Sequence, residues 1–395
     1  MSTTSSATHV QVLAMAMTAG VTIANIYYNQ PILSQIAASL GISEAQAGNI
    51  PVLTQLGFSL GLFFLAPLGD MLDRKALIIA LEGLLCAALL IMAQASHLSC
   101  VYLASFLVGG ASMAVQIVIP MAAGLAHKDR KGHIVSIVFT GTLIGILTAR
   151  IVSGYVAKWF GWRWVYGGSA GLAFAVILMV AQVLPKDPGH HTGSYAALLR
   201  STLYQFVRFD RLRRISLLGA LVFGTFCSFW TTLTFHLSAA PFHYRSDTIG
   251  LFGVAAVASA LIAPIFGQLA DKGRPECIQV ITLGVLIAGV LSTQLWPTSV
   301  VAIIISTILL DMGVQATQVN NLAQIYALDE SSYSRINTIF MTFFFLGGAV
   351  GTSCGLFAWS VGGWQLVCWQ LLLWSTLGFS IALRNAKLAS NETSC

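Results

Sequence analysis

Three charged residues, Asp311, Arg150 and Glu82, lie inside long apolar runs of the sequence. A charged side chain within a membrane-spanning segment is costly, so residues of this kind usually mark a path for ions or substrates. We expect Asp311 to carry a proton, because a carboxyl group in such a place can exist as a neutral acid or as an anion. The alternative is a structural acid that is permanently paired with a neighbouring base.

Arg150 permits three interpretations. It forms a pair with Asp311 that protonation or substrate breaks, it binds an anionic group of a cargo molecule, or it forms a structural pair within one half of the chain. At about 1.5 Å of helix rise per residue, an extended arginine side chain spans the difference in depth to Asp311 if their helices adjoin. Glu82 lies about two turns from the start of its run. We expect Glu82 to reach the membrane surface or to pair with the charged loop before it.

Uncharged polar and aromatic residues gather near the end of the first apolar run and recur in the fourth, seventh and tenth runs. Tyrosines and amides without charge suit a wall that hydrogen-bonds to a neutral or amphipathic solute and stacks on it. The predicted substrate cavity comprises Asn25, Tyr27, Tyr28, Asn29, Gln30, Gln116, Trp230, Gln315, Gln318 and Asn321. For the first-run group, an interfacial aromatic belt is the alternative. Pro31 is expected to bend the helix there, because it leaves the carbonyl four residues back without a donor.

The elements that must position these residues are apolar runs bounded by charged, glycine or proline clusters. The runs lie near 11–33, 45–68, 75–95, 99–125, 132–157, 162–184, 214–240, 248–270, 276–296, 299–327, 334–359 and 363–383. Each is long enough to cross about 30 Å of hydrocarbon as a helix, which satisfies its backbone polar groups internally. The chain is 56% hydrophobic and 9% charged, whereas soluble domains carry about 25% charged residues. We therefore predict an all-α integral membrane protein with 12 transmembrane helices.

Basic residues are distributed unequally between the loops on the two sides of these runs. Of the 20 lysines and arginines, 16 fall on one side, three (Lys158, Arg163 and Arg245) fall on the other, and Arg150 lies inside a run. Cytoplasmic loops carry the excess of basic residues in membrane proteins. Both termini are therefore predicted to be cytoplasmic, and the net charge of +6 belongs to loops beside the bilayer rather than to a nucleic-acid-binding face.

An internal repeat divides the chain into halves. GDMLD at 69–73 recurs as GQLAD at 267–271, and at a constant later offset Gln116 and Gly145 recur as Gln318 and Gly347. Two parallel halves of six spans, with a path between them, are typical of transporters. We predict an N-terminal six-helix bundle at 1–184, a cytoplasmic linker at 185–213 and a C-terminal six-helix bundle at 214–395. The linker's second part is expected to form a basic amphipathic helix at the membrane surface.

Glycines recur at helical spacing in the fifth and eleventh runs, at Gly141, Gly145 and Gly154 and at Gly347, Gly351 and Gly355. Small residues at this spacing let two helices approach closely in a membrane. We therefore expect these glycines to form helix contacts.

The charged loops 69–75 (GDMLDRK) and 267–274 (GQLADKGR) resemble the signature loop of the major facilitator superfamily, which reads roughly G-x-L-x-D-R-x-G-R-K between helices 2 and 3. The first copy departs from it at Ala76 and Leu77. The resemblance implies a two-bundle fold whose helices 1, 4, 7 and 10 line the cavity. It also implies a cytoplasmic latch made by Gly69, Asp70, Asp73, Arg74, Lys75, Gly267, Asp271 and Arg274. The YNQP element of the first run resembles a branch of bacterial proton-driven exporters.

These features lead us to expect a secondary active transporter of the cell inner membrane that exports a small organic molecule in exchange for protons. The alternative is a proton-coupled importer of a small metabolite or sugar-like solute. The sequence has no G-x-x-x-x-G-K-[ST] loop, which argues against ATP drive, and no catalytic constellation typical of an enzyme. Its seven cysteines lack disulfide or metal-ligand spacing, so neither a metal nor a cofactor is expected. The expected partners are a small-molecule substrate, protons and the lipid bilayer; one chain holds the whole path, so a monomer suffices.

Overall fold

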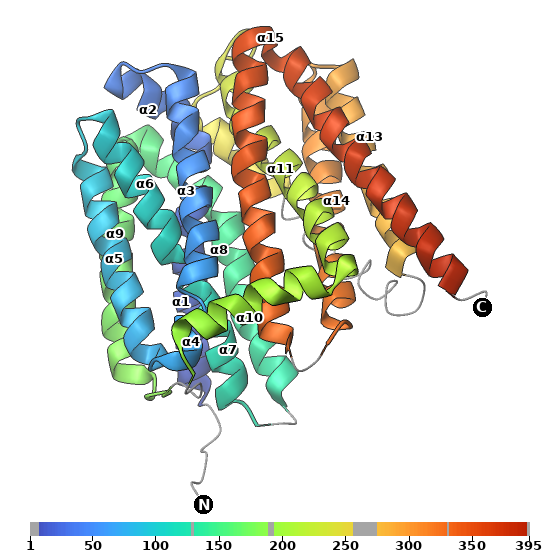
Figure 1. Ribbon diagram of the computed structural model, residues 1–395. Coiled ribbons are helices and arrows are strands. Elements are labelled where there is room, and N and C mark those ends of the chain that lie inside the picture. The colour runs from blue at the N-terminus through green and yellow to red at the C-terminus, as the bar shows by residue number, and fades with distance from the viewer. Residues whose placement is uncertain (1–7, 128–129, 189–192, 256–274, 330–331, 393–395) are drawn as a thin grey trace, which may run out of the picture. The chain divides into compact units, whose positions relative to one another are not determined.

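A computed structural model describes residues 8–127, 130–188, 193–255, 275–329 and 332–392, and over these residues the chain forms helices and no strand (Figure 1). Ten helical stretches of the described residues are long and apolar enough to cross a membrane, and some of these stretches join two or three consecutive helices, as Leu98–Leu125 does. The prediction of an all-α, multi-pass membrane protein is therefore confirmed for the described part of the chain. By its internal contacts the chain divides into two compact units, the first made of Met1–Ile42 and Leu53–Leu199 and the second of Ser43–Val52 and Arg200–Cys395.

The helices before residue 184 correspond to the first six predicted runs. In order they are α1 (His9–Tyr27), the 3-10 helix η1 (Gln30–Ile32), α2 (Leu33–Leu40), α3 (Glu44–Phe64), α4 (Leu68–Met71), α5 (Arg74–Gln94), α6 (Leu98–Ser112), α7 (Val115–Leu125), α8 (Lys131–Phe160) and α9 (Trp162–Val183). Helix α1 packs against α6, α7, α8 and α9, whereas α5 packs against α9 and α6. The polar residues of α1 therefore meet different neighbours according to the face on which they lie.

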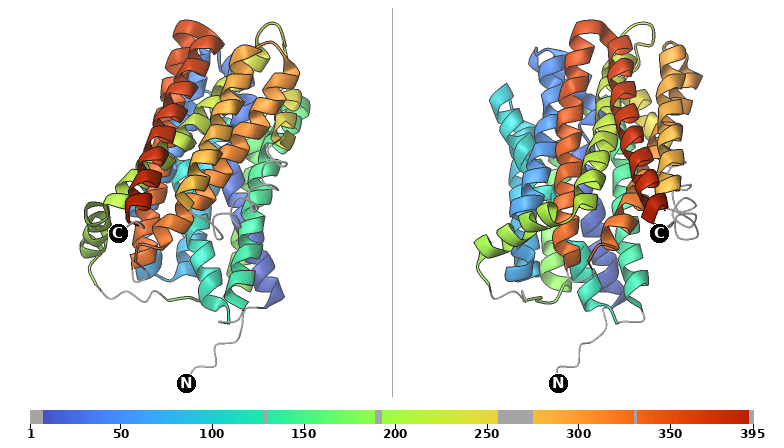
Figure 2. Two further views of the ribbon diagram at one scale, coloured as in Figure 1. Left: turned by 90° about the vertical axis from the view of Figure 1, so that its right-hand side faces the viewer. Right: turned by 45° about the vertical axis from the view of Figure 1, so that its right-hand side comes forward.

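The second unit contains α11 (Asp210–Ser238), α13 (Pro275–Leu295), α14 (Val300–Tyr326) and α15 (Tyr333–Glu392). Helix α15 is interrupted at Gly362 and Gly363, and Gly363 has a φ of +58°, which favours glycine. Its two arms consequently run in opposite directions, and α13 packs against both α14 and α15 (Figure 2). The predicted eighth run, 248–270, is helical over 248–255, and its remainder lies outside the described residues.

The first span is broken where the sequence predicts a bend. Helix α1 ends at Tyr27, and a 3-10 turn over Gln30–Ile32 leads into α2. Pro31 has no N–H to donate to the carbonyl of Tyr27, four residues back, so an α-helical bond is missing at this point. The break places the aromatic and amide residues of α1 at an irregular segment within a long apolar span.

Glycines form the contact between α1 and α8. A Cβ atom at Gly145 would overlap the carbonyl of Gly20, and one at Gly141 would overlap the carbonyl of Ala16. In the second unit, a Cβ at Gly347 would overlap Ala220, so α11 and α15 approach each other in the same way. The expectation that these glycines let helices pack closely is confirmed at these positions.

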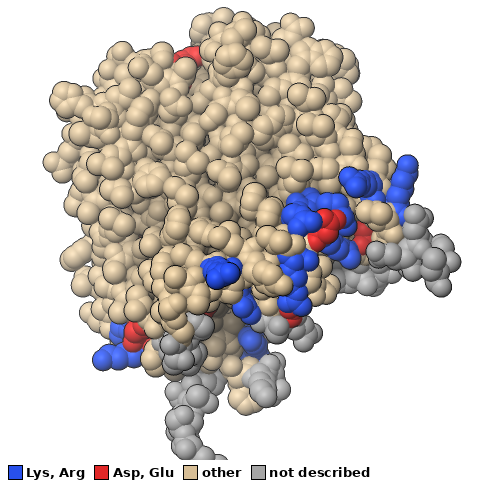
Figure 3. Space-filling model, in the orientation of Figure 1, with Lys and Arg blue, Asp and Glu red and all other residues tan. Residues whose placement is uncertain are grey.

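The linker contains the helix α10 (Tyr195–Arg208). The Tyr195 hydroxyl donates to the carbonyl of Phe64 at 2.6 Å, and partial burial raises the pKa of this phenol. Further along, the ring of Phe206 stacks on Phe343 with centroids 4.6 Å apart. On the face shown in Figure 3, lysines and arginines gather around α10 and the C-terminal end of α15, while the surface above them carries almost no charge. That α10 lies on a membrane surface stays a prediction.

Replacing Gly145 with alanine tests the glycine contact. We expect Gly145→Ala to lower the free energy of unfolding by roughly 1–3 kcal/mol, because the methyl group forces α1 and α8 apart. Gly171→Ala on α9 is the matched control, since a Cβ there has no atom within 4 Å. Thermal unfolding of the purified protein in detergent measures both effects. Equal stability of the two variants would contradict the close packing.

Candidate functional site

Helix α1 presents polar side chains on two opposite faces. At 3.6 residues per turn, Gly20 and Tyr27 share one face, and Thr18, Thr22 and Asn25 share the other. The first face contacts α8 through Gly20. The second contacts α9, where the Ser169 hydroxyl donates to the Asn25 side-chain oxygen at 2.7 Å. The cavity residues that the sequence groups together near the end of α1 are therefore divided between two neighbours.

Arg150 lies on α8 and is only 1% exposed. Its Nε donates to the Oε1 atom of Gln30 at 2.6 Å. Its guanidinium carbon lies 5.2 Å from the centroid of the Tyr27 ring, a cation–π distance. The structure thus brings together three of the predicted site residues, and it surrounds a buried cation with an amide oxygen and an aromatic face.

Asp311 lies on α14 and is 2% exposed. The indole nitrogen of Trp230, on α11, donates to its Oδ1 atom at 3.0 Å. Trp230 is itself 2% exposed and packs edge-on against Phe229. The second unit therefore holds a buried acid beside an indole donor, and both members were predicted from the sequence. The pairing of Asp311 with Arg150 stays a prediction.

The remaining predicted cavity residues are placed as follows. The Tyr28 hydroxyl has a hydrogen-bond contact with Ser169, and the Asn29 amide donates to the carbonyl of Ile26 at 3.3 Å. Gln116 and Gln315 are half-buried on α7 and α14. The Gln318 amide contacts the Met341 sulfur at 3.6 Å, and Asn321 accepts a hydrogen bond from Gln279 at 2.5 Å. Of these residues, Gln315 lies one turn after Asp311 on the same helix, α14.

The first copy of the charged loop is tied to the end of α9. The Arg74 guanidinium donates to Asp187 at 3.1 Å and to Asp70 at 3.3 Å. Lys75 donates to the carbonyls of Ala181 and Leu184, each at 2.7 Å. Asp73 caps the N-terminus of α5 by accepting from the backbone N–H of Ala76 at 3.1 Å, and Gly69 accepts from Arg74 at 3.0 Å.

These contacts account for the basic and acidic residues of the first copy inside the first unit. The second copy, with Gly267, Asp271 and Arg274, lies outside the described residues. A latch formed by both copies stays a prediction.

Glu82 does not reach the surface and does not pair with the charged loop, contrary to our expectation. Its side chain is fully buried, and Oε1 is hydrogen-bonded to the Thr22 hydroxyl of α1. The loop before it is engaged elsewhere, because Arg74 and Lys75 point to Asp187 and to the end of α9. The side chain of Glu82 is therefore directed into the first unit, between helices.

Sequence reasoning missed several partners of the predicted residues. Thr22 and Ser169 lie far along the chain from the groups they bind, and hydropathy alone carries no signal for such a pairing. Arg211 was counted only as a cytoplasmic charge, yet it forms an ion pair with Glu276 at 2.5 Å and donates to Gln324 at 3.0 Å. Its place at the start of a span, opposite an acid at the start of another span, is a signal that could have revealed this contact.

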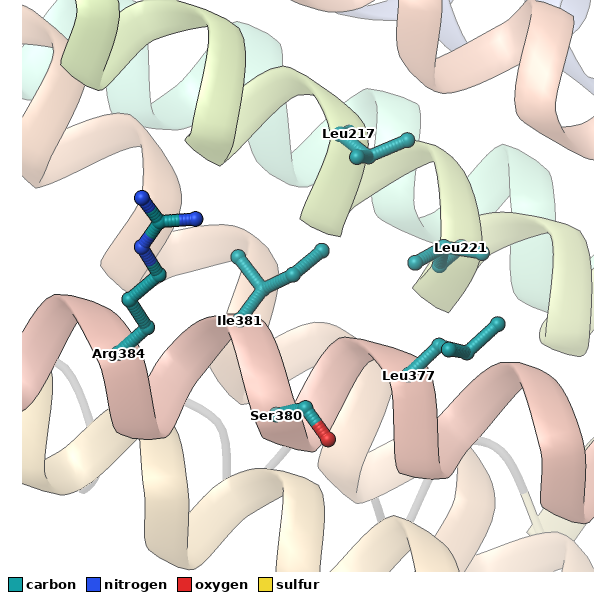
Figure 4. Close-up of a pocket in the computed structure, with 6 residues that line it drawn as sticks. All are labelled: Leu217, Leu221, Leu377, Ser380, Ile381 and Arg384. Carbon is teal, nitrogen blue, oxygen red and sulfur yellow. The ribbon is translucent and has the colours of Figure 1, made fainter.

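A cavity of about 370 Å³ lies between α11 and α15. Figure 4 shows its lining side chains, which come from these two helices: Leu217, Leu221, Leu377, Ser380, Ile381 and Arg384. None of the predicted cavity residues lines it. Over the described residues, no group of three or more His, Cys, Asp or Glu side chains is placed to hold a metal ion.

Comparisons with known proteins place this arrangement in context. The family model of the Major Facilitator Superfamily matches residues 15–352. The uncharacterized transporter YgaY of Escherichia coli O157:H7 is 37% identical over 352 residues, which is 89% of each chain. Transporter SCO4007 of Streptomyces coelicolor is 29% identical over 343 residues, covering 86% of this chain and 79% of the other. The crystal structure of a mutant of the nucleoside transporter NupG is similar in fold, with a TM-score of 0.76 and 12% identity over 94% of this chain and 98% of that chain.

The contact between Trp230 and Asp311 is tested by a double-mutant cycle. We expect Trp230→Phe and Asp311→Asn to be non-additive, with a coupling energy of roughly 0.5–3 kcal/mol, because both remove the same buried hydrogen bond. Thermal unfolding of the two single variants and the double variant measures it. Trp369→Phe is the matched control, because Trp369 is 57% exposed, and it is expected to be additive with Asp311→Asn. Additivity of the Trp230 pair would show that the contact contributes nothing.

Proposed function

The chain belongs to the Major Facilitator Superfamily, and we propose on that premise that it is a secondary active transporter that exports a small organic molecule in exchange for protons. Its relatives are named as transporters, and neither a catalytic set nor a nucleotide-binding loop is present in the sequence. The observation that carries the proton coupling is Asp311, an acid buried within a membrane span beside the Trp230 indole.

The proposed transport cycle alternates access between the two membrane surfaces. In this cycle, Asp311 binds a proton from outside and becomes neutral, which removes a buried charge and frees the units to rearrange. Release of the proton to the cytoplasm restores the anion. Arg150, held by Gln30 and Tyr27, supplies a fixed positive charge in the first unit. It is the proposed partner of Asp311 in the state without cargo.

The cargo of this proposal is neutral or anionic. The described part of α1 contains no acidic residue that could attract a cation, whereas Arg150 offers a guanidinium group. A guanidinium binds carboxylate and phosphate groups with two parallel hydrogen bonds. Tyr27 and Gln30 beside it add an aromatic face and an amide, which suit an organic molecule that carries such an anionic group.

We also propose 12 spans with both termini cytoplasmic, in the inner membrane of a bacterial cell, and a monomer as the working unit. The distribution of basic residues over the loops and the break at Gly362 and Gly363 support this topology. A proton-coupled importer of a small metabolite or sugar-like solute is the second candidate. It has the same topology and differs in the direction of cargo relative to protons.

Proteoliposomes test the coupling. A compound that raises the unfolding temperature of the purified protein is first selected from a library and then used as cargo. We expect an imposed pH gradient to move it against the proton flow, and movement along with the protons would favour the importer. Asp311→Asn is expected to bind the compound but to lose the pH dependence of its transport. Asp210→Asn is the control, because Asp210 is 64% exposed at the start of α11. Unchanged pH dependence in Asp311→Asn would refute the coupling role.

Reporter fusions test the topology. Green fluorescent protein fused to the C-terminus is expected to fluoresce, because it folds in the bacterial cytoplasm. Alkaline phosphatase, which is active only outside the cytoplasm, is expected to be active after His97 and inactive after His127. Activity at both positions, or a dark C-terminal fusion, would contradict the predicted orientation.

A further inference from the structure

The Thr22 hydroxyl takes part in two hydrogen bonds, to Thr18 and to Glu82, but has only one proton to donate. The Thr22 Oγ1 atom lies 2.6 Å from the carbonyl oxygen of Thr18 and is also hydrogen-bonded to Oε1 of Glu82. A hydroxyl group has one proton to donate and two lone pairs that accept. The Thr18 carbonyl has no proton. If Thr22 donates to Thr18, the second hydrogen bond therefore needs a proton that only the Glu82 carboxyl group can supply.

The surroundings of Glu82 contain no cation that would stabilise an anion. Its side chain is fully buried, it forms no ion pair with any described residue, and its Oε2 atom has no hydrogen-bond partner among them. A buried carboxylate without a cation or a full set of donors is costly in a membrane interior. The surroundings of Glu82 therefore suit a protonated, neutral carboxyl group, which is also the form that the hydrogen bonds of Thr22 require.

The titratable groups of the neighbouring helices do not change this conclusion. On α5 itself, the Cys86 thiol is the group in electrostatic contact with Glu82. On α9, Arg163 donates to Ser39 and to the carbonyl of Ala95, and the Tyr166 hydroxyl has no described hydrogen-bond partner. Directly after α1, the Tyr28 hydroxyl contacts Ser169. On α6, Cys100 and Tyr102 form no described bond to Glu82. None of these groups supplies a positive charge to the carboxyl.

We propose that Glu82 is a proton-binding site inside the first unit, with Thr22 as its hydrogen-bonding partner. In the protonated state, the carboxylic acid donates to Thr22 and Thr22 donates to the Thr18 carbonyl. When the acid releases its proton to water, the carboxylate has only lone pairs, so the Thr22 hydroxyl turns from Thr18 to Glu82. The exchange moves one proton off the protein and reverses the direction of one hydrogen bond.

This site is linked to the environment of Arg150 through α1. Thr22 lies on the face of α1 opposite Gly20 and Tyr27, and the Asn25 amide one turn further on donates to the backbone carbonyls of Val21 and Thr22. A change in the hydrogen bonds of Thr22 therefore acts on the turns of α1 that precede Tyr27 and Gln30. The consequence for transport rests on the proposed function, whereas the binding of a proton by Glu82 does not.

Chemical labelling tests the proton site without transport. Dicyclohexylcarbodiimide adds to protonated carboxyl groups in apolar surroundings; the carboxyl oxygen bonds to the carbodiimide carbon, the acid proton passes to its nitrogen, and rearrangement leaves a stable N-acylurea. We expect peptide mass spectrometry to find the adduct at Glu82 in protein reconstituted into lipid, with labelling that declines as the pH rises. Fragment ions distinguish Glu82 from Cys86. The exposed carboxyl of Asp210 is expected to remain unlabelled, and an unlabelled Glu82 across the pH range would overturn the proposal.

Substitutions at Thr22 separate a proton site from a merely buried acid. Thr22→Val keeps the shape of the side chain but removes its hydroxyl, and we expect the pH midpoint of Glu82 labelling to shift by about one unit or more. Thr22→Ser restores a hydroxyl and is expected to restore the midpoint of the unchanged protein. An unshifted midpoint in Thr22→Val would refute the role of Thr22. Glu82→Gln, whose amide can also donate to Thr22, is expected to keep the unfolding temperature of the unchanged protein, and a large loss of stability would show that the packing requires an anion.

The two proposals fail separately. If Glu82 is labelled as expected while Asp311→Asn leaves transport unchanged, the proton site stands and the coupling role of Asp311 falls. If Asp311→Asn abolishes the pH dependence and Glu82 is never labelled, the coupling role stands and the proton site falls.

Discussion

A polar side chain inside a membrane must find its partner within the protein, because lipid offers neither donors nor acceptors. Helices satisfy their own backbone groups, so the side chains decide which helix faces meet. In the first unit, Arg150 finds Gln30 and Tyr27, and Glu82 finds Thr22. In the second unit, Asp311 finds Trp230. Each of these contacts joins two different helices, so a movement of one helix against another must exchange the partners of a buried polar group.

The glycine contacts supply the rigid counterpart of these polar contacts. Gly145 and Gly141 hold α8 against the backbone of α1, and Gly347 holds α15 against α11 in the corresponding place of the second unit. Close backbone approach maximises van der Waals contact, which drives helix association in lipid. Arg150 lies on the same helix as Gly145, so the glycine contact between α1 and α8 also fixes the distance from the guanidinium group to Tyr27 and Gln30. The repeat in the sequence is therefore a repeat of this packing in each unit.

Spans and repeats were predictable because they depend on composition and spacing, which can be read along the chain. The break after Tyr27 was predictable for the same reason, since Pro31 removes a specific backbone donor. The direction of side chains was not predictable, because apolar residues occur on all faces of a membrane helix, so hydropathy does not distinguish the protein-facing side from the lipid-facing side. Asn25 and Tyr27 therefore looked like one wall, although they lie on different faces. The expectation for Glu82 was wrong for a related reason: its partner Thr22 lies in another span, and the sequence does not show which spans face each other.

The two buried acids differ in what their partners can do. The indole of Trp230 is a donor only, so its bond to Asp311 suits an oxygen that accepts, as both oxygens of a carboxylate do. The hydroxyl of Thr22 both donates and accepts, so it can serve Glu82 as an acid and as an anion. Under the proposed function, loss of charge at Asp311 weakens its hydrogen bond to Trp230 and so the contact between their helices. A change of charge at Glu82 leaves its contact with Thr22 in place and reverses the direction of the hydrogen bond. The first acid is suited to release a helix, and the second to sense a proton while the helices stay packed.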